Sequence, residues 1–145
     1  MVVIKSSLFP ASKEEVFCRL QKPETLQYVA WPYAAFTPVG EKITDWKAGK
    51  TSAYRFSLFG RIPFGTHTIN VITFDMDKGI FTHERNEHVP VWNHRIVLNG
   101  FSETQCFYSD IVEIGAGWKT VFVWLWANCF YALRQRKWIK LLENK

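Results

Sequence analysis

His94 and Asp110 are the side chains in this sequence whose types and spacing best suit proton-transfer chemistry. They fall on two predicted strands, 91–98 and 104–114, which would lie side by side as a hairpin. An imidazole with its ordinary pKa of about 6.5 accepts or releases a proton near neutral pH. A neighbouring carboxylate would fix its tautomer, so this pair is the candidate general acid or base.

The register of that hairpin decides whether His94 and Asp110 share a face of the sheet. Asn99-Gly100 is a strong two-residue turn signal. With a turn of two or three residues, His94 faces Gln105 or Cys106, and Asp110 lies on the same face or on the opposite one. The sequence leaves both registers open. A surface or structurally hydrogen-bonded histidine is the simpler interpretation, because most perturbed histidines are not catalytic.

Four further residues, His83, Glu84, Glu87 and His88, have side chains of the kind that binds metals. They stand at the end of a predicted strand, where their spacing does not place two imidazoles on one helical face as an H-E-x-x-H motif would. We therefore expect a solvated loop here, and predict neither a metal nor a cofactor. His67 alternates with apolar residues and is expected to be a hydrogen-bonded core histidine.

The sequence contains no G-x-S-x-G nucleophile elbow, Walker loop or G-x-G-x-x-G motif. Hydrolase, NTPase and dinucleotide-binding functions therefore lose their usual support. The net charge is +5, but the basic residues are scattered except within 134–140. Cations near a helix carboxy terminus are expected from the helix dipole, and no stacking platform for single strands accompanies them, so no nucleic-acid partner is predicted.

Cys18, Cys106 and Cys129 are far apart and odd in number, which predicts neither a disulfide framework nor a zinc site. A reducing compartment fits this pattern, and the expected localisation is cytoplasmic. The most apolar stretch, 121–133, is too short to cross a bilayer, which takes about 20 residues. No transmembrane segment is expected.

The elements that must position these residues follow from length, composition and pattern. The 145 residues are 48% hydrophobic, which suits one domain over 1–145. β-branched and aromatic runs separated by turn residues predict about seven short strands: 2–8, 36–39, 51–59, 66–74, 80–85, 91–98 and 104–114. A Ser12-x-x-Glu15 capping box and Pro23 predict two short helices after the first strand, the second over 23–29.

One long helix is predicted from near Trp118 to Leu142. Its first half is apolar almost all round, which predicts burial on more than one side, while 134–140 makes its last turns polar. Trp124, Tyr131 and Trp138 recur every seven residues and form one stripe. Core packing is the favoured interpretation of the stripe, with a ligand wall or the seam of a homodimer as the alternatives.

Several segments resemble the SRPBCC superfamily, also called START-like or Bet v 1-like, and they occur in the family's order along nearly the whole chain. They are Ala11-Ser12-Lys13-Glu14-Glu15-Val16-Phe17, Pro23-Glu24-Thr25-Leu26, Trp92-x-His94 with Thr104 and Asp110-x-Val112-Glu113, and Phe130-Tyr131-x-x-Arg134-Gln135-Arg136-x-Trp138. The resemblance implies an α+β helix-grip fold, in which a curved antiparallel sheet wraps around a long carboxy-terminal helix. The polyketide cyclase-like and uncharacterised bacterial members are the most similar.

The resemblance implies a cavity between sheet and helix that binds an apolar or amphipathic small molecule such as a lipid, a sterol or a polyketide. Aromatic residues make up 17% of the chain, more than a core of this size requires. We therefore expect Trp92, His94, Trp124, Phe130 and Tyr131 at the cavity wall. Two alternatives remain, namely a cyclase or dehydratase that uses His94 or Asp110 as proton carrier, and a protein-interaction module like the family's chaperone activators.

Overall fold

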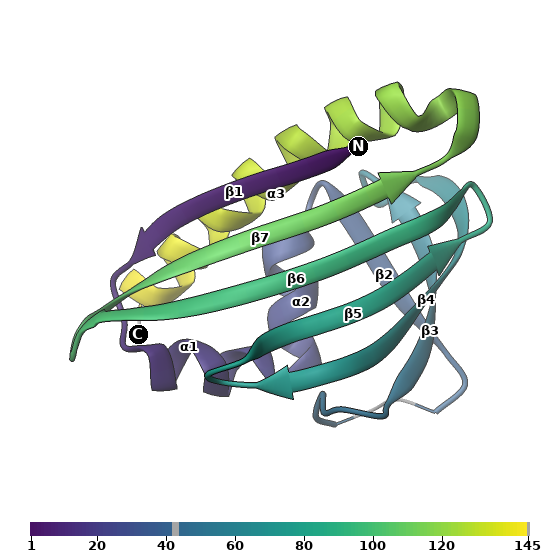
Figure 1. Cartoon of the computed structure of the whole chain (residues 1–145). Helices are drawn as coiled ribbons and strands as arrows, with labels where there is room; N and C mark the ends of the chain where they lie inside the picture. The colour runs from purple at the N-terminus through teal and green to yellow at the C-terminus, as the bar shows by residue number, and fades with distance from the viewer. Residues whose placement is uncertain (42–43, 145) are drawn as a thin grey trace.

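Seven strands form one antiparallel sheet in the computed structural model, which describes residues 1–41 and 44–144. The spatial order is β1-β7-β6-β5-β4-β3-β2, so β1 and β2 are the edges (Figure 1). Consecutive strands from β2 onward pair as hairpins, and only β1 pairs with a distant strand. The strands are β1 Val2–Phe9, β2 Ala34–Val39, β3 Thr51–Leu58, β4 Ile62–Asp75, β5 Gly79–Asn86, β6 Val89–Ser102 and β7 Gln105–Gly115.

The predicted helices are present, with small differences at their ends. They are α1 (Lys13–Leu20), α2 (Pro23–Ala30) and α3 (Thr120–Glu143), and a 3-10 turn, Gly117–Lys119, precedes α3. The Ser12 side chain accepts a hydrogen bond from the Glu15 backbone N–H at 3.2 Å, which confirms the predicted cap of α1. Pro23 occupies the first turn of α2, where its missing N–H is not needed.

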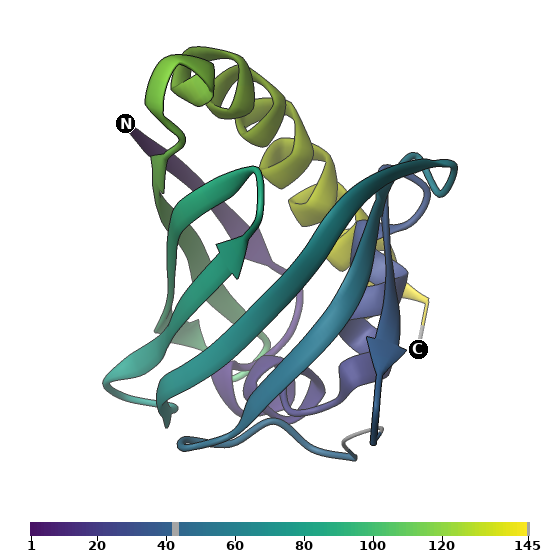
Figure 2. The same ribbon diagram turned by 90° about the vertical axis from the view of Figure 1, so that its right-hand side faces the viewer.

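The sheet curls around α3, as Figure 2 shows from the side. Register shifts interrupt four of the strand pairs, between Arg55 and Ser57, Val71 and Thr73, Glu84 and Asn86, and Gly100 and Ser102. Such bulges bend a strand and increase its twist, so they supply the curvature. The α+β helix-grip class predicted from the sequence is confirmed.

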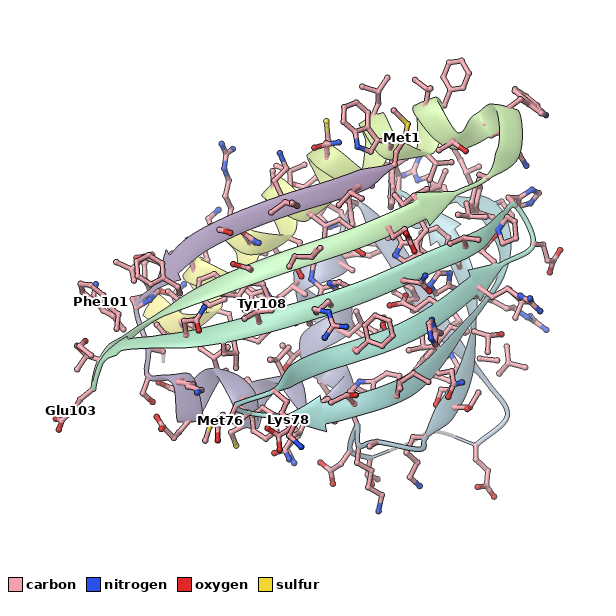
Figure 3. The ribbon with its side chains drawn as sticks, in the orientation of Figure 1. Met1, Met76, Lys78, Phe101, Glu103 and Tyr108 are labelled. Atoms are coloured by element: carbon pink, nitrogen blue, oxygen red, sulfur yellow. The ribbon has the colours of Figure 1, made fainter. Side chains whose placement is uncertain are left out.

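The predicted turn at Asn99-Gly100 was wrong. Both residues stay in β6, where they pair with Phe107 and Cys106, and β6 and β7 separate only after Ser102. Figure 3 shows Phe101 and Glu103 at the far tip of this hairpin. The Phe101 and Phe107 rings lie 5.5 Å apart across the strands, and this cross-strand packing extends the pairing beyond the local turn signal.

The register of the hairpin is therefore settled. His94 lies opposite Val112, not opposite Gln105 or Cys106 as either predicted register required. Because side chains alternate along a strand, Asp110 shares a face with Val112 and hence with His94. That face is the inner, buried one.

The predicted burial along α3 was also wrong. Trp118 and Phe122 are 82% and 67% exposed, whereas Arg134 and Gln135, expected in polar last turns, are buried. The helix contacts the rest of the protein through one face, on which buried residues recur every three or four positions. On the other face of its first half, Val121, Phe122 and Leu125 are about half exposed or more.

The three residues of the predicted stripe also differ in burial, because Tyr131 and Trp138 are buried and Trp124 is only half-buried. Trp138 is fully buried and stacks with Phe9 and lies against Tyr108, which confirms core packing at this position. Burying one such large side chain stabilises a protein by roughly 1.5–3 kcal/mol. Within the described part of the chain, no helix is both long enough and apolar enough to span a membrane.

Candidate functional site

A cavity of about 90 Å³ lies between the inner face of the sheet and helices α2 and α3. Its wall is mostly apolar and aromatic, with contributions from β2 to β6 and from both helices. The aromatic residues of the wall are Phe36, Trp46, Phe56, Phe64, Phe74, Trp92, Trp126, Phe130, Tyr131 and Trp138. Polar side chains interrupt this wall mainly at Thr82, Glu84, Asn86, His67, His94 and Arg134.

Four of the five residues expected at the cavity wall, Trp92, His94, Phe130 and Tyr131, lie there. The Trp92 indole N–H donates to the Tyr131 hydroxyl at 3.1 Å and so ties the hairpin to α3. Trp124 lies elsewhere, because its indole N–H donates to the Val2 carbonyl at 2.9 Å, at the exposed edge beside β1. Its seven-residue spacing from Tyr131 predicted that the two share a face of the helix, but this spacing does not show where along the helix the cavity ends.

Four neighbouring strands each direct one ionisable side chain toward the inside of the sheet. They are His67 from β4, Glu84 from β5, His94 from β6 and Asp110 from β7. The prediction of a solvated loop was wrong for Glu84, because β5 continues to Asn86 and strand alternation turns Glu84 inward.

The predicted solvent exposure was right for the other three residues of this group. His83, Glu87 and His88 are exposed. The His83 ring nitrogen pairs with the Asn93 side chain at 2.7 Å on the outer face. Among the residues that the structure describes, no group of three or more has the arrangement needed to hold a metal ion.

Glu84 receives donors from three sides. The His67 Nε2–H donates to its Oε1 at 2.7 Å, and the Thr82 hydroxyl donates to its Oε2 at 2.7 Å. His94 Nδ1 stands 3.6 Å from the same Oε2. Burial opposes the charged form, but the contacts with His67 and His94 outweigh it and hold the pKa of Glu84 well below its ordinary value.

Asp110 is fully buried and also has three donors. His94 Nε2–H donates to its Oδ1 at 2.7 Å, and the Tyr108 hydroxyl donates to the same oxygen at 3.1 Å. The Gln135 amide donates to Oδ2 at 2.9 Å, so α3 is joined to the inner face of β7. Burial again favours the neutral acid, yet the His94 hydrogen bond and the nearby Arg134 charge keep the pKa of Asp110 below its ordinary value.

His94 therefore lies between two carboxylates. Burial would lower its pKa, but Asp110 and Glu84 together raise it above the ordinary value of histidine. A general base needs a ring nitrogen free to accept a proton from substrate. Both nitrogens of His94 face carboxylates, so this geometry favours a fixed imidazolium that holds strands together over a proton carrier.

Arg134 is a cavity residue that the sequence analysis did not single out. It is only 7% exposed and lines the cavity, where its guanidinium lies 5.6 Å from the centre of the Tyr131 ring. Burial disfavours its charge, but Tyr108 and Asp110 nearby raise its pKa above the ordinary value. Its position between Tyr131 and Trp138 on the buried face was the available signal, since residues three and four apart share a helical face.

Comparisons with known proteins agree on the fold. A protein from Chromobacterium violaceum superposes with a TM-score of 0.79 at 14% identity, covering 98% of this chain and 96% of the other. A START superfamily protein from Mycobacterium smegmatis has a TM-score of 0.75 at 13% identity, with 99% and 97% covered. The Aha1 dimer from Colwellia psychrerythraea has 0.69 at 14% identity, with 99% and 96% covered.

The likeness lies in structure and not in sequence. No family model matches the chain, and no curated protein matches it significantly. Near-complete coverage of both chains means that the whole arrangement of sheet and helices is shared, not one motif. The chain therefore has the helix-grip fold of the START-like (SRPBCC) proteins.

Proposed function

We propose that this protein binds a small apolar or amphipathic molecule in the cavity between the sheet and α3. The observation that carries this proposal is the aromatic cavity itself, which reaches a buried polar group, Arg134, on its helical side. Ligand sites are commonly apolar hollows with a few polar groups that fix orientation. Binding would gain about 25 cal/mol for each Å² of apolar surface removed from water, before the costs of association.

The size of the cavity limits the occupant. Most sites for drug-sized ligands enclose about 300–1,000 Å³, and an apolar cavity of about 150 Å³ takes up benzene. A space of about 90 Å³ is smaller than that cavity, so a one-ring molecule is the largest occupant to expect and would need some wall side chains to shift. A sterol or a long-chain lipid would require several aromatic side chains to move.

The same geometry argues against the cyclase or dehydratase alternative. Asp110 has no exposed surface and is saturated with donors, and His94 has a carboxylate at each nitrogen. A proton carrier needs a position from which it reaches the substrate. Asp110 offers no such position, and His94 lines the cavity with both ring nitrogens directed at carboxylates.

A second candidate function, docking of another protein, rests on a different feature. Four apolar side chains are each about half exposed or more, namely Trp118 in the 3-10 turn and Val121, Phe122 and Leu125 on the amino-terminal half of α3. Adjacent exposed apolar side chains of this size are typical of interaction surfaces. The Aha1 structure from Colwellia psychrerythraea is described as a dimer, so self-association through this face is one form that the candidate takes.

Binding of benzyl alcohol, a neutral one-ring probe, tests the cavity proposal. Saturation-transfer NMR should detect saturable binding to the wild-type protein. Phe130→Trp should weaken it, because the larger ring occupies part of the cavity. Phe122→Trp makes the same change on the exposed side of the same helix and should leave the affinity unchanged.

Thermal unfolding must first show that both variants remain folded. Equal affinities for both variants would place the probe outside the cavity and contradict the proposal. Absence of saturable binding would also contradict it, and would leave the exposed face of α3 as the favoured functional surface.

A further inference from the structure

Two buried donors in the cavity wall have no hydrogen-bond partner. They are Nε of Arg134 and Nε1 of Trp138. The two residues are four apart in α3 and therefore lie one turn apart on the same helical face. Buried donors without partners are uncommon and costly in folded proteins, which points to an acceptor that completes them.

Around Arg134 and Trp138, hydrogen-bond donors outnumber the acceptors that are free to pair with them. Glu84 and Asp110, the carboxylates nearest to the cavity, each receive three neighbouring donors. Arg134 carries five N–H donors. It forms no ion pair within 4 Å among the described residues, and its nearby acceptors are the Tyr108 hydroxyl and, at longer range, Asp110. A further acceptor, and not a further donor, is therefore the missing partner.

We propose that Arg134 and Trp138 form an anion subsite of the cavity, which holds the carboxylate of a small organic acid while the aromatic wall covers its apolar part. This inference rests on the proposed function and names the chemical class of the ligand. A guanidinium presents a planar fork that matches a carboxylate with two parallel hydrogen bonds. The stacked rings of Trp126 and Phe130, 4.7 Å apart on the same helix, supply flat apolar surface in the same cavity.

The charge of the surroundings favours a monoanion. Arg134 and His94 together balance the charges of Asp110 and Glu84, so a carboxylate bound at Arg134 adds one net negative charge to this region. A phosphate dianion would leave an extra negative charge buried in the same region as Asp110 and Glu84, and that charge is costly in a low-dielectric interior. The cavity volume of about 90 Å³ adds that the acid is small.

Benzoate and benzamide test the subsite, because they have nearly the same shape and differ in charge. Titration calorimetry at neutral pH and constant ionic strength should show that wild-type protein binds benzoate about tenfold to a hundredfold more tightly than benzamide, as one charge-assisted pair implies. Arg134→Met should abolish this preference while keeping the volume of the side chain. Arg136→Met, an exposed position in the same helix turn, should retain it.

A second measurement does not depend on a variant that folds. In NMR spectra of wild-type protein, benzoate should shift the Arg134 Nε–H and Trp138 indole N–H signals, and benzamide should shift them much less. Equal affinity for the two probes, or a preference that survives in Arg134→Met, would overturn the subsite and leave the cavity proposal standing. Failure of benzoate, benzamide and benzyl alcohol alike to bind saturably would overturn both.

Discussion

Raising the pH from about 6.5 to 8 should destabilise this protein, because folded His94 holds a proton that the unfolded chain releases. The pKa of His94 is raised in the folded protein by Asp110 and Glu84, against the opposing effect of burial. A group with a raised folded pKa contributes its full stabilisation below its unfolded pKa, which is about 6.5 for histidine. That stabilisation is lost as the pH rises through the folded pKa.

The magnitude follows from the linkage between proton binding and folding. One proton bound in the folded state and absent from the unfolded state changes the free energy of unfolding by about 1.4 kcal/mol per pH unit. Over this window the loss would reach up to about 2 kcal/mol if His94 stays protonated throughout. Glu84 and Asp110 have lowered pKa values, so their stabilisation is complete above pH about 4 and is lost only as the pH falls.

Urea unfolding followed by tryptophan fluorescence at several pH values measures this slope. The window ends at about pH 8, below the ordinary cysteine pKa of about 8.5. Burial also raises the pKa of Cys106, so a higher upper limit would add a contribution from this cysteine. His94→Gln should flatten the curve, whereas His88→Gln, at an exposed position, should leave it unchanged. A wild-type stability that is constant or rises over this window would refute the assignment of His94 as a buried imidazolium, and so would an unchanged slope in His94→Gln.

Two further predictions concern stability and use the same urea assay. Asp110→Ala removes the acceptor of His94 and leaves a buried cation unpaired, so it should cost about 3–5 kcal/mol; Glu113→Ala, exposed on the same strand, should cost less than about 1 kcal/mol, and equal costs would show that the buried network is not what matters. Gly79→Ala should destabilise by about 1–3 kcal/mol, because its φ is +95° and a Cβ there would lie 2.7 Å from the Ile96 carbonyl oxygen. Gly100→Ala, where a Cβ meets nothing within 4 Å, should be nearly neutral, and a reversed ranking would contradict the backbone described for the β5–β6 pair.

The order of elements and the class of the fold could be predicted from the sequence, because their signals are local. The Ser12 side chain can reach only its own helix start, and Pro23 is tolerated only in a first helical turn, so both predicted their helices without any tertiary contact. Strand alternation likewise marked the inward histidine of β4, His67, which is buried with Glu84 as its partner. Short-range patterns of this kind need no knowledge of the partner strand.

The candidate site depended on contacts between residues distant in the sequence. Whether His94 meets Asp110 was decided by packing at the tip of the β6–β7 hairpin, which overrode the Asn99-Gly100 turn signal. Two more strand residues past that signal fixed the register, and with it the face of every side chain on the hairpin.

Burial on α3 was likewise a tertiary outcome. The polar residues Arg134 and Gln135 are inside, and the apolar residues Phe122 and Leu125 are outside, because the sheet covers one face of the helix regardless of the local polarity. The sequence by itself determined the elements and supplied the aromatic residues for a cavity. Only the tertiary structure decided which polar side chains enter it, because a buried charge is tolerated only where distant strands and helices bring its partners together.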